Sequence, residues 1–219
     1  MALSLIYHPF SSYSWKALIA LYEAGTPFTP LSLEHAENGA TLGKLWPMGK
    51  FPVLVDDARG VTLPESSVII EHLDTYYPGP TPLLPKDTDT RLQVRLMDRV
   101  FDNYIHTPMQ QHVSDRLRPT GHNDPHGVAQ AGTALDNAYA WLNTYMTNRT
   151  WAVGDSFTLA DCAAAPALFY ADWVRPIGAR FPNITAYRAR LLARPSVKRA
   201  VDDARPWRKL FPGGAPDRD

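Results

Sequence analysis

The stretch that decides the fold reads Gly49-Lys50-Phe51-Pro52-Val53-Leu54-Val55-Asp56, and it is followed by Pro64-Glu65-Ser66-Ser67. A proline inside an apolar strand removes one donor of the hydrogen-bond ladder, so Pro52 is expected at the strand's start, at a sheet edge or after a cis peptide bond. A cis bond before proline costs only about 0.5 to 1 kcal/mol. With a cis Phe51–Pro52 bond, the backbone N–H and C=O of Phe51 turn outward, and the sequence predicts a place where an extended peptide can pair.

The residues after Pro64 predict the start of a helix that can hold a charged headgroup. The apolar residues that follow have the spacing of one helix face: Val68, Ile69, Leu73 and Tyr76. Glu65 and Ser66 then fall at the helix N-terminus, where free N–H groups and the positive end of the dipole favour a carboxylate, while Glu65 can accept from an ammonium. An amino-acid headgroup would fit this pair. The alternative is that both side chains only cap the helix.

Together the two motifs resemble the glutathione-binding half of the cytosolic glutathione transferase superfamily, whose members serve in detoxification. In that family the residue before the cis-proline pairs with the cysteinyl backbone of glutathione, and the Glu-Ser pair holds its γ-glutamyl end. The resemblance implies that glutathione is the co-substrate and that Phe51, beside Pro52, and Glu65 with Ser66 take these roles. It also implies that Lys50 lies near the glycyl carboxylate.

The first 78 residues are predicted to form an α/β domain of the thioredoxin-like type. The pattern predicts strands at 3–7, around 28–33, from Pro52 and at 61–63, helices up to Gly25 and from Glu65, and a loop through 35–46. The order βαβ, loop, ββα is that of a thioredoxin-like domain, with a parallel half and a hairpin half.

The rest of the chain is predicted to be helical. Residues 79–87 form an expected linker, because four prolines and a glycine fall between Tyr77 and Pro85. Helices are predicted over 88 to about 116, 125–148, 158–174 and 183–194, the third with a capping box at Thr158 and Asp161. Residues 88–211 are thus expected to be an all-helical domain, which by resemblance contributes the electrophile site, and residues 212–219 a disordered tail.

Composition narrows the partners and the location. The 219 residues contain 22 Lys and Arg against 22 Asp and Glu, and no basic block stands out, so neither a nucleic-acid nor a membrane partner is expected. No apolar run approaches a membrane span and no basic leader precedes the first strand, which predicts a cytoplasmic location. The single cysteine, Cys162, is expected to be a packed thiol, and no metal is expected. The resemblance implies a homodimer.

The first strand–helix junction carries the candidate catalytic residues. A free thiol has a pKa near 8.5, so chemistry on glutathione at pH 7 needs a hydroxyl donor and a helix N-terminus that favour the thiolate. The segment Ser11-Ser12-Tyr13-Ser14-Trp15-Lys16 resembles the Ser-Ser-Cys-Ser-Trp-Arg segment of the zeta class, which puts the catalytic role on Ser11 with Ser12 beside it. The alternative is that the two serines only cap the helix. Tyr13 replaces the zeta cysteine, which argues against a maleylacetoacetate isomerase.

The electrophile pocket is expected where the helical half faces this junction. His106 and Met109 lie near Pro108 on a long helix, and with Phe10 and Trp173 they are candidates for an apolar lining, although a lone histidine is more often a satisfied side chain. Asp102 could reach the γ-glutamyl ammonium across a dimer interface, or could be a solvated carboxylate. The sequence thus predicts a glutathione transferase for small hydrophobic electrophiles, with a glutathione-dependent isomerase or a non-catalytic binding module as alternatives.

Overall fold

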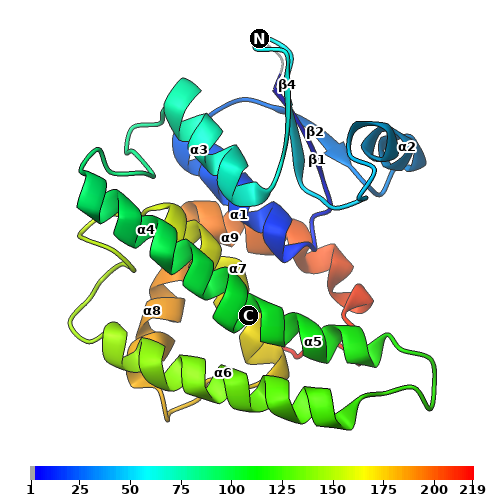
Figure 1. Ribbon diagram of the computed structural model, residues 1–219, viewed down its shortest axis with the longest axis vertical. Helices are drawn as coiled ribbons and strands as arrows, with labels where there is room; N and C mark the ends of the chain where they lie inside the picture. The colour runs from blue at the N-terminus through cyan, green and yellow to red at the C-terminus, as the bar shows by residue number, and fades with distance from the viewer. Residues whose placement is uncertain (1–2) are drawn as a thin grey trace.

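The computed structural model describes residues 3–219, in which a small mixed sheet is followed by a helical bundle (Figure 1). The elements of the first half are β1 (Leu3–Tyr7), α1 (Ser12–Ala24), β2 (Thr29–Ser32), α2 (Ala36–Leu45), β3 (Val53–Asp56), β4 (Val61–Pro64) and α3 (Ser66–Tyr76). The elements of the second half are α4 (Thr88–Val100), the π-helical turn η1 (Phe101–His106), α5 (Thr107–Arg116), α6 (Pro125–Tyr145), α7 (Leu159–Val174), α8 (Pro182–Ala193), α9 (Pro195–Ala204) and the 3₁₀ turn η2 (Arg205–Leu210).

The sheet has the strand order β2-β1-β3-β4, with β1 parallel to β2 and antiparallel to β3. Leu5 and Leu54 face each other across β1 and β3, and both are fully buried against the helices that follow. Ile6 and Val53 point to the other face, where Leu42 of α2 covers them. Both faces are therefore packed, and the predicted thioredoxin-like class of this half is confirmed.

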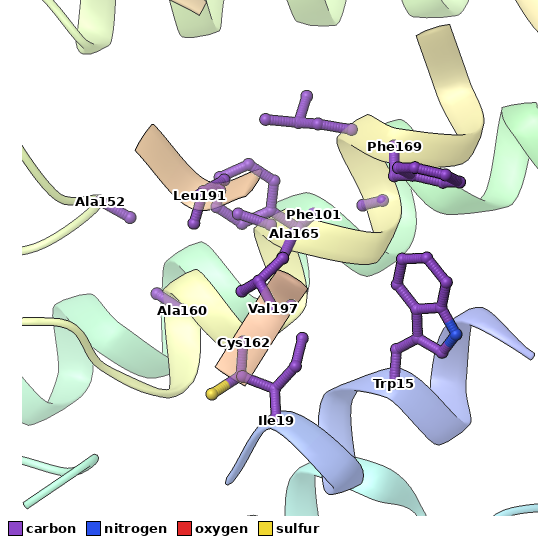
Figure 2. Packing of buried hydrophobic residues seen from close by; sticks show 14 of the residues in the cluster. Trp15, Ile19, Phe101, Ala152, Ala160, Cys162, Ala165, Phe169, Leu191 and Val197 are labelled. Atoms are coloured by element: carbon purple, nitrogen blue, oxygen red, sulfur yellow. The ribbon is translucent and has the colours of Figure 1, made fainter. Parts of the chain in front are cut away.

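Helix α7 is the centre of the helical half, and almost all of its residues are buried. Figure 2 shows Trp15 of α1 beside Phe169 of α7 and Ile19 of α1 beside Cys162 of α7, so the cores of the two halves merge. A helix that is apolar all round is expected at such a position. Cys162 is fully buried in this core, as predicted for a packed thiol. Burial raises the pKa of this thiol well above its usual value.

The predicted capping box starts α7. The backbone N–H and the hydroxyl of Thr158 both donate to Oδ2 of Asp161, at 2.9 and 3.1 Å. Asp161 Oδ1 also accepts from the backbone of Ala152 and the hydroxyl of Tyr187, so the carboxylate is satisfied inside the core. The role of Asp161 is structural, as the sequence indicated.

Two sequence predictions about elements are wrong, and one helix was not predicted. The expected loop through 35–46 contains helix α2. The helix predicted over 183–194 is α8, which ends at Ala193 before Pro195 as expected, but Pro195 then occupies the first turn of the unpredicted helix α9. The expected disordered tail is bound to the helical half, because Arg218 contacts Asp172 at 3.0 Å and Asp219 pairs with Arg205 at 2.5 Å. Within residues 3–219, no helix is long and apolar enough to cross a membrane.

Candidate functional site

A cleft of about 730 Å³ opens where the sheet half faces α4, η1, α5 and the C-terminal segment. Ten of the twelve residues singled out from sequence line it: Phe10, Ser11, Ser12, Lys50, Phe51, Pro52, Glu65, Ser66, Asp102 and Met109. The other two, His106 and Trp173, do not. Residues from distant parts of the sequence thus meet in one space, although their roles stay predictions.

The wall next to β3 has the predicted backbone geometry. The Phe51–Pro52 bond is cis, and Gly49 has a φ of 65°, a left-handed conformation that glycine adopts at little cost. The Phe51 side chain packs on the small cluster formed by Ile6, Leu42 and Val53. The side chain is therefore directed to the core beneath α2, while the residue borders the cleft.

The N-terminus of α3 forms the second wall. Glu65 has φ 71° and ψ 109°, a conformation that a residue with a side chain rarely adopts and that costs on the order of 1–3 kcal/mol. Its side chain makes no capping bond to the helix, so for Glu65 the capping alternative is wrong. Ser66 is buried as the first residue of α3. A carboxylate and the free N–H groups of a helix start thus border the same end of the cleft.

The two serines at the start of α1 have different partners. Ser11 is the N-cap, and its Oγ accepts from the backbone N–H of Ser14 at 3.2 Å. Its hydroxyl proton is not used by that bond and is available to an acceptor in the cleft. Ser12 Oγ lies 3.1 Å from Nε2 of His106. Capping and donation are therefore compatible at Ser11.

Two buried aromatic side chains hold the loop that precedes these serines by hydrogen bonds to its backbone. The indole N–H of Trp15 donates to the carbonyl of Pro9 at 2.6 Å, and the hydroxyl of Tyr170 donates to the carbonyl of Phe10 at 2.9 Å. Tyr170 belongs to α7, so the helical half fixes the position of the loop. Such support keeps a hydroxyl in a defined place without the entropy loss of ordering it on binding.

His106 lies behind the cleft rather than in its lining. It is 3% exposed, and burial, with a smaller contribution from Lys16, lowers its pKa to about 3, so the ring is neutral at pH 7. Its ring centroid is 4.3 Å from that of Tyr13, and both residues border a smaller pocket of about 320 Å³. The expectation that His106 lines the main cleft is wrong, and its contact is with Ser12.

Tyr13 separates the two pockets. Burial, and then the charge of Asp102, raises the pKa of Tyr13 to about 12. The phenol is therefore neutral at physiological pH and can serve only as a hydrogen-bond donor or acceptor. It cannot replace the thiol that the zeta segment has at this position.

A buried ion cluster joins α1, α4 and η1 behind the polar end of the cleft. Lys16 contacts Asp98 at 2.7 Å and Asp102 at 2.8 Å, and Arg99 contacts the same two carboxylates at 2.6 and 2.5 Å. Asp102 is 5% exposed, so the interpretation of a solvated carboxylate is wrong. Burial raises the pKa of Asp102, whereas at Asp98 the cations Lys16 and Arg99 outweigh burial and lower it.

Lys16, Asp98 and Arg99 were not predicted from the sequence as part of the site. A signal was present, because Lys16 lies among the apolar residues Trp15, Leu18 and Ile19 of a buried helix, and a buried lysine requires an anionic partner.

The other end of the cleft is apolar. Its lining residues from α5 and the C-terminal segment are Met109, Gln110, Val113, Ser114, Leu117, Leu210, Phe211 and Pro212, none of them charged. Trp173, expected here, packs behind this wall, with its ring 6.2 Å from Phe10 and 5.0 Å from Phe211. Phe211 takes the place that was predicted for Trp173.

The described part of the chain has no cluster of side chains that could bind a metal ion. Residues 3–219 contain no group of three or more His, Cys, Asp or Glu side chains placed to hold an ion. The cleft is bordered by Glu65 in a strained conformation at the start of α3, by Ser11 and Ser12 at the start of α1, and by apolar side chains at its other end.

These features define a class: a thioredoxin-like half with a cis-proline, facing a helical half across a cleft. Residues 5–81 match the glutathione S-transferase N-terminal domain family, and residues 101–195 match the glutathione S-transferase C-terminal domain family. A solved glutathione S-transferase from Methylobacterium radiotolerans, in complex with glutathione sulfonate, aligns over 100% of this chain and 99% of its own, with a TM-score of 0.79 and 30% identity. The chain belongs to the cytosolic glutathione transferase superfamily.

Two curated relatives have different names. FtsZ-localized protein A of Caulobacter vibrioides is 27% identical, with 95% of this chain and 94% of the relative aligned. Maleylacetoacetate isomerase of Pseudomonas aeruginosa is 28% identical, with 99% of this chain and 98% of the relative aligned. Membership of the superfamily therefore does not by itself select one activity.

Proposed function

We propose that this protein is a glutathione transferase that ionises the thiol of glutathione with the hydroxyl of Ser11 and directs the thiolate at small hydrophobic electrophiles. The observation that carries the proposal is that Ser11, an N-cap with an unused hydroxyl proton, borders the same cleft as Phe51, Glu65 and Ser66. The related structure that holds glutathione sulfonate supports glutathione as the occupant.

The tripeptide would lie along the sheet half of the cleft. The α-carboxylate of its γ-glutamyl residue meets the free N–H groups of α3 at Ser66, and its ammonium meets Glu65. The cysteinyl backbone pairs with Phe51, and Lys50 neutralises the glycyl carboxylate. Asp102 borders the γ-glutamyl end from within the same chain.

Ser11 is the better donor of the two serines. A thiolate accepts a hydrogen bond, so the catalytic hydroxyl needs a proton that no protein group holds. At Ser11 the only side-chain bond among the described residues is one in which Oγ accepts. At Ser12 the hydroxyl is shared with a neutral His106, and if it donates there its proton is not available to sulfur.

The apolar end of the cleft would take the electrophile. Phe10, Met109, Val113 and Phe211 offer a lining that favours uncharged carbon groups. The two cations that line the cleft, Lys50 and Arg99, are both on the glutathione side. The proposed substrates are therefore neutral and compact.

The test is the pKa of the bound thiol. Thiolate absorbance of the glutathione complex, followed against pH, is expected to give a pKa below the free value. Ser11→Ala should raise the pKa of the bound thiol by about one to two units, because a charge-assisted hydrogen bond contributes on the order of 1.5–3 kcal/mol. Its kcat/KM with a model aryl halide should fall by about 10- to 100-fold.

Ser12→Ala should have a smaller effect, and Ser156→Ala, in an exposed loop between α6 and α7, none. The proposal fails if glutathione binds but Ser11→Ala changes neither the thiol pKa nor the rate.

An isomerase of the maleylacetoacetate type is the second candidate, because a relative of that name aligns over nearly the whole chain. Its substrate is a dicarboxylate, whereas the apolar end of the cleft carries no cation among its lining residues. A direct assay with maleylacetoacetate decides between the two activities: turnover faster than that of aryl halides would favour the isomerase.

A non-catalytic binding module is the third candidate, and the name FtsZ-localized protein A keeps it open. A pure binding module has no use for a hydroxyl aimed at a thiol. Retention on immobilised glutathione without any lowering of the thiol pKa would favour this alternative.

The proposed protein is a cytoplasmic homodimer. Apolar side chains are exposed on α3, α4 and η1: Val68 at 49%, Leu92 at 55%, Leu96 at 53% and Tyr104 at 62%. Several large exposed apolar groups on neighbouring elements are typical of an interface. Sedimentation should give about twice the chain mass of 24.4 kDa, and Leu92→Asp with Leu96→Asp should reduce it to one chain.

A further inference from the structure

The C-terminal segment closes the apolar end of the cleft, and this has a consequence for the size of the electrophile. Leu210, Phe211 and Pro212 border the cleft, and Phe211 is 4% exposed. Its ring lies 5.0 Å from that of Trp173 and 6.5 Å from that of Tyr170. The ring is therefore backed by α7 and cannot retreat from a ligand without disturbing packed aromatic side chains.

Arg116 ties this segment to α5. Its Nη1 donates to the carbonyl of Pro212 at 3.0 Å, and its guanidinium lies 5.7 Å from the centre of the Phe211 ring. Arg116 is the last residue of α5, whose earlier turns carry Met109 and Val113 of the cleft lining. One cation thus bridges the two elements between which the apolar end lies.

Gly213 follows this bridge with a φ of 81°, a left-handed conformation that favours glycine. A Cβ here would make only ordinary contact, at 3.5 Å, with Cδ and Nη1 of Arg116, so the backbone conformation and not the space explains the glycine. Gly213 follows Pro212 directly, and none of the described residues 213–219 is among those that line the cleft. The wall therefore ends at a defined residue.

The residues after the turn are fastened in two places. Arg218 contacts the carboxylate of Asp172 at 3.0 Å and the carbonyl of the same residue at 2.8 Å. Asp219 pairs with Arg205 at 2.5 Å and also with Arg208. Both ends of the segment 211–219 are thus attached to the helical half, which keeps Phe211 in position.

We infer that Phe211, held by Arg116, is the end wall of the electrophile subsite and limits the length of the apolar group that this protein accepts. The inference rests on the proposed function, because it assigns the apolar end of the cleft to the group attached to the sulfur of glutathione. It makes Phe211 a specificity-determining residue and Arg116 a positioning residue. The preferred electrophiles are single rings or short alkyl groups.

A series of S-alkylglutathiones measures the distance to the wall. Each methylene that enters the apolar end should tighten binding by about fourfold, until the chain reaches the wall and the gain stops. Dissociation constants of S-methyl- to S-decylglutathione, measured by calorimetry with the full chain, locate this plateau. In Phe211→Ala the gain should continue for at least two further methylenes, which is about tenfold or more in affinity relative to the natural protein.

Arg116→Met tests the support without touching the ring. It keeps most of the side-chain stem but removes the bond to Pro212, and the plateau should move to longer chains while the affinity for S-methylglutathione stays the same. Arg149→Met is the matched control, because the guanidinium of Arg149 also lies over an aromatic ring, 4.5 Å from the centre of Tyr145, but not at the cleft. This control should leave the plateau unchanged.

The outcomes separate the inference from the function on which it rests. If the natural protein does not bind S-methylglutathione, the proposed function fails and the inference with it. If S-methylglutathione binds but the plateau is absent, or is the same in the natural protein, Phe211→Ala and Arg116→Met, the end wall is refuted while glutathione binding stands. Thermal unfolding of each variant confirms that it is folded, and Phe211→Leu replaces Phe211→Ala if the latter is not.

Discussion

Glu65 shows at the level of a single residue how the site holds a costly conformation. A glycine would adopt φ 71° and ψ 109° readily, yet the chain has a glutamate there whose carboxylate does not cap the helix. Because strain of this kind is concentrated at ligand sites, we expect the carboxylate to serve binding rather than stability. A substitution that removes the carboxylate and relieves the backbone strain should therefore weaken glutathione binding without lowering the stability of the fold.

Glu65→Gly and Glu65→Gln separate these two contributions. Both remove the carboxylate and should weaken glutathione binding by about tenfold or more, since hydrogen bonds to charged groups contribute about 1.5–3 kcal/mol. Glu65→Gly also relieves the backbone strain and should be at least as stable to urea as the natural protein, whereas Glu65→Gln should not gain stability. Equal stability losses in both variants would contradict the assignment of strain.

His106 makes stability depend on pH. Burial and Lys16 lower its folded pKa to about 3, while the unfolded value is about 6.5. Below pH 6.5 the unfolded chain therefore takes up a proton that the folded protein does not, so the free energy of unfolding is complete above pH 6.5 and falls as the pH drops towards 3. The contribution of this residue can reach about 1.4 kcal/mol per pH unit.

Urea unfolding at pH 7.5, 6.5, 5.5 and 5.0 measures this effect, above the range in which ordinary carboxyl groups titrate. His106→Gln should flatten the dependence, whereas His126→Gln, at an exposed histidine, should leave it unchanged. A slope unaffected by His106→Gln would show that another group is responsible.

At the scale of elements, the sheet, α1, α3 and the starts of the later helices could be predicted because their signals are local. The cis-proline, the apolar spacing of each helix face and the capping box at Thr158 each fall within a few residues. Ten of the residues that the resemblance to the glutathione transferase family singled out border one cleft.

The elements that were missed depend on packing that the local pattern hides. Helix α2 contains Asn38, Gly39 and Gly43, all weak helix formers, and its only buried residue is Leu42, which covers the sheet. Helix α9 begins at Pro195, which was taken as a stop although proline is favoured in a first turn. The spacing of its apolar residues was legible: Val197, Ala200, Val201 and Ala204.

Lys16 is the residue through which α1 depends on α4. Lys16→Met would leave Asp98 and Asp102 with Arg99 as their remaining cation, and the side chain of Arg99 is 49% exposed. Removing one partner of a buried ion pair typically costs 3–5 kcal/mol, and a loss of about this size in the free energy of unfolding is expected. Lys198→Met, which removes an exposed pair with Asp202, should cost less than about 1 kcal/mol.

At the scale of the whole molecule, the two halves share one core. The buried cluster runs without interruption from Leu5 and Trp15 in the first half to Phe169 and Val201 in the second. Polar contacts also join the two halves. Arg194 of the second half contacts Glu23 of α1 at 2.6 Å, and the hydroxyl of Ser196 donates to the same carboxylate. A shared core of this kind favours unfolding in a single step, in contrast to domains joined only by a linker.

We therefore expect one cooperative transition, in which the first half cannot unfold while the second stays intact. Tryptophan fluorescence reports on both halves, and amide exchange of Leu5 in the sheet and of Leu168 in α7 reports on each separately; all three should give the same free energy of unfolding. Glu23→Gln weakens the boundary and should lower both exchange free energies by the same amount, of about 1–3 kcal/mol. If it lowered only the value for the sheet, or if the transitions of the two halves separated, the halves would be independent units, and the cleft between them would owe its shape to its ligand rather than to the fold.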